Sequence, residues 1–252
     1  MPLDSRPWVA ASPLDVVRSL VFYLVFYVGS IPYVVGAAVM MPIAQRPFQR
    51  IVTGWSVWHR VCARWLLGIR VRVEGTIPKG PVIIALRHES FFEAIDLPTL
   101  LDDPIIVAKA ELMNIPLWGM AAQRWGLIVV RREDGDRALR AMVTEARART
   151  AQGRPLAIFP EGTRIAHGQE AELQSGFAAL YKLLGFSVVP VAVASGHLYH
   201  RWFKRPGTVV YRFCEAIPPG LRREEIEARV GEAITTFNRE ANEGARPSTG
   251  SG

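Results

Sequence analysis

An uncharged run near the N-terminus restricts the fold of this chain more than any other feature. Residues 19–44 contain no Asp, Glu, Lys or Arg. That stretch exceeds the ~20 apolar residues that a helix needs to cross a bilayer. Gly29, Pro32 and Gly36 interrupt it near the middle. We therefore expect either a single kinked membrane span or a helical hairpin that dips into one leaflet and turns near residues 29–32.

The charges around this run indicate its orientation. Six arginines fall within residues 46–72, whereas Arg6 and Arg18 before the run are offset by Asp4 and Asp15. The positive-inside rule therefore places the C-terminal bulk of the chain in the cytoplasm. A cleaved signal peptide is disfavoured because the run is longer than a usual signal-peptide core and no convincing small-residue cleavage site is visible.

Residues 47–69 have the apolar spacing of a second helix. Its apolar positions recur at steps of three and four: Ile51, Trp55, Trp58, Cys62, Trp65, Leu66 and Ile69. A Trp-rich face flanked by arginines suits a helix in the membrane interface. It equally suits a helix packed on its own domain, and the two are compatible. We expect residues 1–68 to form a membrane-anchoring region.

The rest of the chain alternates short apolar strands with helical stretches. Strands are expected at 69–74, 82–86, 105–108, 127–130, 156–159, 188–193 and 208–213. Helices are expected at 91–101, 117–123, 136–152, 173–184 and 223–240. The alternation predicts an α/β domain over residues 69–241, with a largely parallel mixed sheet of about seven strands flanked by helices. Residues 242–252 are rich in Gly, Ser and Pro and are expected to be disordered.

Charge and cysteine content narrow the partners. The net charge of +7 favours an anionic partner, and the apolar N-terminal run favours a membrane surface over nucleic acid. The two cysteines, Cys62 and Cys214, have no CxxC spacing. They suggest neither a zinc site nor a disulfide framework.

One polar cluster follows the strand expected at 82–86. His88 is followed by Glu93, at the start of a predicted helix. A histidine beside a carboxylate is the minimum set for general-base activation of a hydroxyl. The spacing alone is a weak signal, because a solvated histidine has the same pattern.

Other strand ends carry cations. Phe-Pro-Glu-Gly-Thr-Arg at residues 159–164 follows a strand, with Gly162 permitting a tight turn and Arg164 offering a fork for phosphate. The alternative is a surface turn with a Glu–Arg ion pair. Lys109 and Arg132 also lie just past strands. Ligands gather beyond the carboxyl ends of parallel strands, so these groups predict a pocket for a phosphorylated substrate whose hydroxyl loses a proton.

Together these segments resemble the four-block signature of the glycerophosphate and lysophosphatidic acid acyltransferase family, in its bacterial form. The matches are His88 with Glu93, Arg132 after the strand at 127–130, the complete 159–164 block, and Val-Pro-Val at 189–191. The family's usual acid is Asp, so Glu93 is a departure, and Asp96 lies three residues further on. Arg131 stands where an acidic residue is common in the family.

The resemblance implies direct acyl transfer at the inner (cytoplasmic) membrane. His88 would deprotonate the sn-2 hydroxyl of lysophosphatidic acid, which attacks the thioester of acyl-CoA or acyl carrier protein, while Glu93 orients His88. Arg164 is the first choice for the substrate phosphate, with Lys109 and Arg132 next; Glu161, Gly162 and Thr163 would shape that loop. The bilayer is the implied partner, and no metal, cofactor or nucleic acid is expected.

Four alternatives stay open. Ser90 could be an acyl-accepting nucleophile, although it lacks a nucleophile-elbow context and suits a helix cap. The acceptor could be another lysolipid, such as lyso-ornithine lipid. The protein could be a non-catalytic lipid-binding scaffold, although it retains both His88 and Glu93. The basic and aromatic stretch at 199–205 could stack nucleic-acid bases, but it suits a membrane interface or the donor's phosphates better.

Overall fold

The computed structural model describes residues 11–114, 118–130, 135–199, 202–238 and 240. Within them, seven strands form one sheet in the order β1-β7-β6-β2-β5-β3-β4. Neighbouring strands are parallel except for β6 and β7, which are antiparallel. The predicted α/β fold with a largely parallel mixed sheet is confirmed. The predicted disordered tail at 242–252 lies outside the described residues, as do Arg131 and Arg132.

The strands begin close to where the sequence placed them. They are β1 (Ile69–Glu74), β2 (Ile83–Leu86), β3 (Ile105–Lys109), β4 (Leu127–Val130), β5 (Leu156–Ile158), β6 (Val188–Ala194) and β7 (Gly207–Phe213). The helices are α1 (Pro13–Met40), α2 (Gln45–Leu66), α3 (Phe91–Leu100), η1 (Ala110–Asn114), α4 (Trp118–Trp125), α5 (Gly135–Thr150), α6 (Ser175–Leu184), α7 (Gly196–Tyr199) and α8 (Arg223–Ile234).

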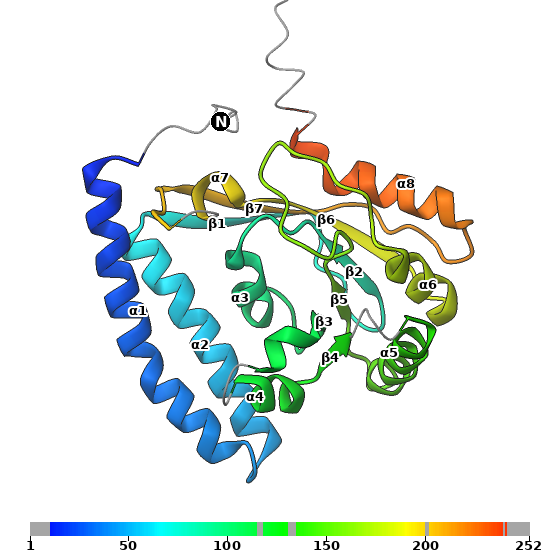
Figure 1. Ribbon diagram of the computed structural model, residues 1–252, viewed down its shortest axis with the longest axis horizontal. Helices are drawn as coiled ribbons and strands as arrows, with labels where there is room; N and C mark the ends of the chain where they lie inside the picture. Colours follow the sequence, from blue (N-terminus) through cyan, green and yellow to red (C-terminus); the bar gives the residue numbers. More distant parts are fainter. Residues whose placement is uncertain (1–10, 115–117, 131–134, 200–201, 239, 241–252) are drawn as a thin grey trace, which may run out of the picture.

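The central strands are buried on both faces, because helices cover each side of the sheet (Figure 1). Residues of β2 alternate between two hydrophobic clusters. Ile84 and Leu86 face the side covered by α1, α2 and α3. Ile83 and Ala85 face the side covered by α5, α6 and α8. This two-sided burial explains why the central strands are continuous apolar runs rather than alternating ones.

The apolar N-terminal run forms one helix, α1, which continues through Pro32. Of the two expected arrangements, the hairpin turning near residues 29–32 is therefore wrong and a single helix is observed; the chain turns after Met40, between α1 and α2. Proline removes a single backbone donor, and tertiary packing holds the helix together here. A Cβ atom on Gly29 would lie 2.5 Å from the Trp58 ring of α2, and the Trp55 indole N–H donates to the Ser30 hydroxyl at 2.9 Å.

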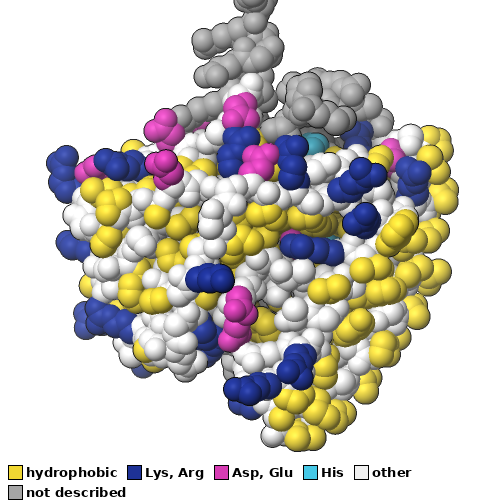
Figure 2. All heavy atoms as spheres, turned by 180° about the vertical axis from the view of Figure 1, so that it is seen from behind, with side chains coloured by type: hydrophobic (Ala, Val, Ile, Leu, Met, Phe, Trp, Pro, Cys, Tyr) yellow, Lys and Arg dark blue, Asp and Glu magenta, His cyan; other side chains and the backbone are white. Residues whose placement is uncertain are grey.

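The outward face of α1 is a continuous apolar stripe. It includes Leu20, Leu24, Tyr27, Ile31 and Val35, each more than half exposed. By length and composition α1 is able to cross a membrane, and only 17% of its most apolar 18-residue window is buried. Figure 2 shows this hydrophobic surface along the side of the molecule formed by α1.

The Trp-rich face of α2 packs mainly on the protein itself. Trp55 and Trp58 are partly buried against the hydrophobic core, and Cys62 is fully buried. Trp65 is the exception, with 76% of its surface exposed. The interpretation of α2 as a helix packed on its own domain is thus confirmed, and contact of Trp65 with a membrane stays a prediction.

Candidate active site

The turn between β2 and α3 places the predicted histidine and carboxylate together. Ser90 caps α3 by accepting a hydrogen bond from the Phe92 N–H at 3.1 Å. Glu93 completes the cap, because its Oε1 accepts from the Ser90 N–H at 2.6 Å. This reciprocal arrangement is a capping box, and it fixes the Glu93 side chain at the start of the helix.

His88 contacts Glu93 and not Asp96. Its Nδ1 lies 3.0 Å from Glu93 Oε1. Asp96 instead pairs with Arg60 of α2, with 2.8 Å between Nη2 and Oδ2. The His88 ring stacks on Phe159 with 4.1 Å between centroids. Since Nδ1 is engaged by a carboxylate, Nε2 is the nitrogen with a lone pair available to a substrate.

The Glu93 carboxylate is buried and heavily hydrogen-bonded. Burial raises its pKa, but the hydrogen bond and charge of His88, the Ser90 N–H and the Ser195 hydroxyl outweigh burial and hold the pKa below its ordinary value. The Ser195 hydroxyl donates to Oε2 at 2.7 Å. Sequence reasoning missed Ser195. The signal available in the sequence was its position directly after the strand β6, beside the expected site.

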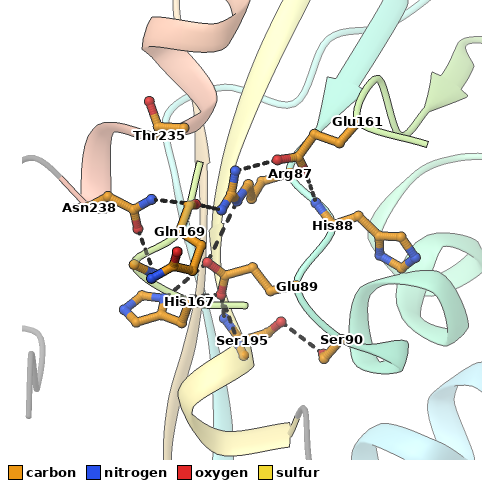
Figure 3. A network of polar contacts seen from close by, with 12 residues as sticks. Arg87, His88, Glu89, Ser90, Glu161, His167, Gln169, Ser195, Thr235 and Asn238 are labelled. Carbon is orange, nitrogen blue, oxygen red and sulfur yellow. Dashed lines mark hydrogen bonds and ion pairs between the residues drawn. The ribbon is translucent and has the colours of Figure 1, made fainter. Parts of the chain in front are cut away.

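Glu161 holds the backbone of His88 in place. One oxygen accepts from the His88 N–H at 3.0 Å, and the other accepts from the guanidinium of Arg87 (Figure 3). Both side chains are 1% exposed or less. Burial raises the pKa of Glu161 despite the neighbouring Arg87 cation. Glu161 therefore belongs to an internal network rather than to an ion pair with Arg164, and sequence reasoning missed Arg87.

The other predicted residues whose side chains the structure describes line one cavity, which His88 also lines. Arg164 is exposed, with its guanidinium 4.0 Å from the Phe91 ring centroid. Gly162 has a φ of 66°, the left-handed backbone that favours glycine. Lys109 ends β3 and is exposed. All three residues line the cavity together with Thr163 and His88.

This cavity has a volume of about 730 Å³, within the range of small-molecule sites. Most of the remaining wall is apolar, and α1, α2, α3 and β3 contribute to it. Its apolar residues include Phe26, Ala37, Trp55, Ile95 and Val107. A histidine and two cations thus stand beside an extended hydrophobic space. In the described part of the chain, no group of three His, Cys, Asp or Glu side chains is arranged to hold a metal ion.

Comparisons with known proteins agree with this architecture. The acyltransferase family model matches residues 68–194. A 1-acyl-sn-glycerol-3-phosphate acyltransferase of Pseudomonas aeruginosa is 30% identical over 207 residues, which cover 79% of each chain. A lyso-ornithine lipid O-acyltransferase of the same species is 31% identical over 211 residues, covering 75% of this chain and 78% of that one.

A solved structure shares the fold. The 1-acyl-sn-glycerophosphate acyltransferase PlsC from Thermotoga maritima superposes with a TM-score of 0.74 at 22% identity, covering 93% of this chain and 100% of that one. The family model spans half of the chain, and the Pseudomonas relatives cover most of it at 30% identity or more. On this evidence, the chain belongs to the acyltransferase family.

Proposed function

We propose that this enzyme transfers a fatty acyl group from acyl-CoA or acyl carrier protein to the sn-2 hydroxyl of lysophosphatidic acid, giving phosphatidic acid. The observation that carries the proposal is the position of His88. It is held at 3.0 Å by a buried carboxylate and lines an apolar cavity that two exposed cations, Arg164 and Lys109, also line. A base, an anion site and space for a fatty chain are what this reaction requires.

The acyl group passes directly from the donor to the acceptor through a tetrahedral intermediate. His88 Nε2 removes the proton of the acceptor hydroxyl as its oxygen attacks the thioester carbonyl carbon. Glu93 keeps Nδ1 protonated and stabilises the imidazolium that forms. Collapse of the intermediate breaks the carbon–sulfur bond, and the His88 proton passes to the departing thiolate. The products are the ester and the free thiol, and His88 returns to its neutral form.

Two exposed cations suit the acceptor's phosphate. Arg164 offers a planar fork, and stacking on Phe91 orients it toward the cavity mouth. Lys109 reaches the same cavity from the end of β3. Arg132 is assigned to this group by the family resemblance alone. Glu161, Gly162 and Thr163 position the Arg164 loop, with Glu161 acting through Arg87 and the His88 backbone.

We place α1 in one leaflet of the inner membrane, with the active site on the cytoplasmic face. The exposed stripe of α1 suits hydrocarbon, but its other face packs on α2, which carries Arg46, Arg50 and Arg64. A perpendicular span would draw those arginines into the bilayer, which is costly. Cysteine labelling tests this arrangement: residues 12 and 44 should both react from the cytoplasmic side, and labelling from opposite sides would support a span.

A lyso-ornithine lipid is the second candidate acceptor, because a lyso-ornithine lipid O-acyltransferase of Pseudomonas aeruginosa is 31% identical to this chain. The chemistry at His88 would be unchanged, but this acceptor has no phosphate for Arg164. Purified protein assayed with both donors against a panel of lysolipids separates the two. We expect the highest kcat/KM with lysophosphatidic acid; a preference for lyso-ornithine lipid would replace the acceptor, and no transfer to any lysolipid would reject the proposal.

A further inference from the structure

A second histidine–carboxylate pair lies behind the active-site pair. Glu89, the residue after His88, is 1% exposed, and its Oε1 lies 3.0 Å from His167 Nδ1. His167 comes from the loop after Arg164, and its ring packs on His197 at 4.8 Å between centroids. Neither Glu89 nor His167 lines the cavity, so this pair does not touch the reacting atoms.

Ser195 joins the two pairs. Its hydroxyl donates to Glu93 Oε2 at 2.7 Å, and its backbone N–H donates to Glu89 Oε2 at 2.9 Å. The next N–H, from Gly196, donates to the same Glu89 oxygen at 2.8 Å. Figure 3 shows Glu89 between His167 on one side and Ser195 on the other. A continuous series of hydrogen bonds thus runs from His167 through Glu89, Ser195 and Glu93 to His88.

Packing along this series leaves little room for adjustment. A Cβ atom on Gly196 would lie 3.0 Å from Glu89 Cβ and 3.2 Å from the His167 backbone nitrogen. The start of α7, the Glu89 side chain and the His167 loop therefore meet in direct contact. Asn238 holds the same loop from the C-terminal side, since its Oδ1 accepts from the Gly168 N–H at 3.1 Å. A displacement of Glu89 would pass directly to Ser195.

The charges of the network indicate what His167 contributes. Three buried carboxylates, Glu89, Glu93 and Glu161, lie here, and the Arg87 guanidinium is the cation paired with Glu161 and Glu89. The Arg87 guanidinium contacts Glu161 directly but is 3.8 Å from Glu89. A buried carboxylate is costly unless it receives hydrogen bonds. His167 supplies one to Glu89 through Nδ1–H, whether its ring is neutral or protonated.

We propose that His167 is a positioning residue, which acts together with the capping box to fix Glu93, and hence His88, through Glu89 and Ser195. Without the His167 donor, Glu89 turns toward Arg87 and releases the N–H groups of Ser195 and Gly196. The Ser195 hydroxyl then moves from Glu93, and the carboxylate holds the His88 ring less firmly. Loss of the His167 donor should therefore lower the rate of the chemical step and leave substrate binding unchanged, because His167, Glu89, Ser195 and Glu93 do not line the cavity.

The first test compares His167→Ala with His167→Asn by steady-state kinetics of acyl transfer. Asparagine keeps an N–H donor near the position of Nδ1, whereas alanine removes it. We expect His167→Ala to lower kcat about tenfold with both KM values unchanged, and His167→Asn to recover kcat to within about twofold of the parent. Gln169→Ala is the matched control, because this exposed side chain lies on the same loop and Gln169 contributes its backbone carbonyl to the network.

The second test is a double-mutant cycle with Ser195→Ala. Because the series passes through the Ser195 hydroxyl, His167→Ala should lower kcat less than twofold further once that hydroxyl is absent. Effects that multiply would overturn the proposal. So would equal losses in the Ala and Asn variants, or a lower melting temperature with kcat unchanged.

This inference rests on the proposed role of His88, and the two fail separately. An active His88→Ala protein would remove the proposed function. An inactive His88→Ala protein beside a fully active His167→Ala protein would overturn the positioning role alone.

Discussion

Two histidine–carboxylate pairs lie on either side of the same turn, and their geometry is nearly equal. His88 to Glu93 and His167 to Glu89 are both 3.0 Å apart, both carboxylates are buried, and the histidine side chains are 15% and 12% exposed. They differ in what the second ring nitrogen meets. His88 lines the apolar cavity, whereas His167 packs against His197 and lies outside it.

A histidine–acid pair is therefore not, by itself, evidence of a general base. The motif His-x4-acid describes a local geometry, and His167 achieves the same geometry with a carboxylate far away in sequence. Access of the free ring nitrogen to a substrate-sized space separates the base from the support.

Glu93→Gln should produce the largest loss. The amide removes the charge that stabilises the His88 imidazolium and no longer fixes the Nδ1–H tautomer, so we expect kcat to fall by about 10³-fold. Glu93→Asp, which restores a carboxylate on a shorter side chain, is the control and should recover part of the loss. Steady-state kinetics with lysophosphatidic acid measures both. If Glu93→Gln lowered kcat no more than His167→Ala, the two pairs would not differ as described.

Arg164→Ala should weaken binding of the acceptor substrate and leave the His88–Glu93 pair intact. Loss of one charge-assisted contact to phosphate is expected to lower kcat/KM for lysophosphatidic acid by about 10–100-fold, mainly through KM. The same variant should change kcat/KM for lyso-ornithine lipid by less than about threefold. An equal loss with both acceptors would show that Arg164 supports the loop and does not bind phosphate.

Acid pH should separate the parent from Glu93→Gln in stability. The pKa of Glu93 is lower in the folded protein than in the unfolded chain, so its contribution is fully present above its ordinary value of about 4.3 and is lost as pH falls through the folded pKa. Urea unfolding at a series of pH values from neutral to acidic should therefore show a steeper fall in the free energy of unfolding for the parent. Parallel curves would contradict the lowered pKa.

The smallest expected effect concerns the part of the cavity wall that α1 contributes. Ala37 of α1 lines it, so Ala37→Leu should shorten the space and shift kcat/KM toward shorter acyl donors by several-fold. Val35→Leu is the matched control, because Val35 lies on the exposed side of the same helix. Competition between donors of two chain lengths gives the ratio directly. An unchanged ratio in Ala37→Leu would place the reacting acyl chain elsewhere.

Local sequence signals were sufficient for the sheet and for the first pair. The strands are predicted because central parallel strands read as short apolar runs, and Glu93 is predicted because it stands five residues after His88, the His-x4-acid spacing, at the start of the expected helix. The sequence leaves a single helix and a hairpin turning at residues 29–32 both open; packing of Gly29 and Ser30 on α2 overrides the turn signal of Pro32 and gives the single helix.

The second pair was beyond such reasoning. His167 and Glu89 are 78 positions apart, and Ser195 lies 106 positions from Glu89. Contacts at such separations depend on which strands become neighbours, here β2 between β5 and β6, and spacing along the chain does not reveal that order. The short helix α7, which supplies Gly196, was missed for the same reason.

The most direct measurement is kcat for acyl transfer by His88→Asn beside His167→Asn. In each variant the amide keeps an N–H donor to its carboxylate and removes the second ring nitrogen. If His88 is the base and His167 a support, His88→Asn should lose about 10³-fold or more in kcat, and His167→Asn should stay within about twofold of the parent. Comparable kcat values in the two variants would contradict these roles of His88 and His167.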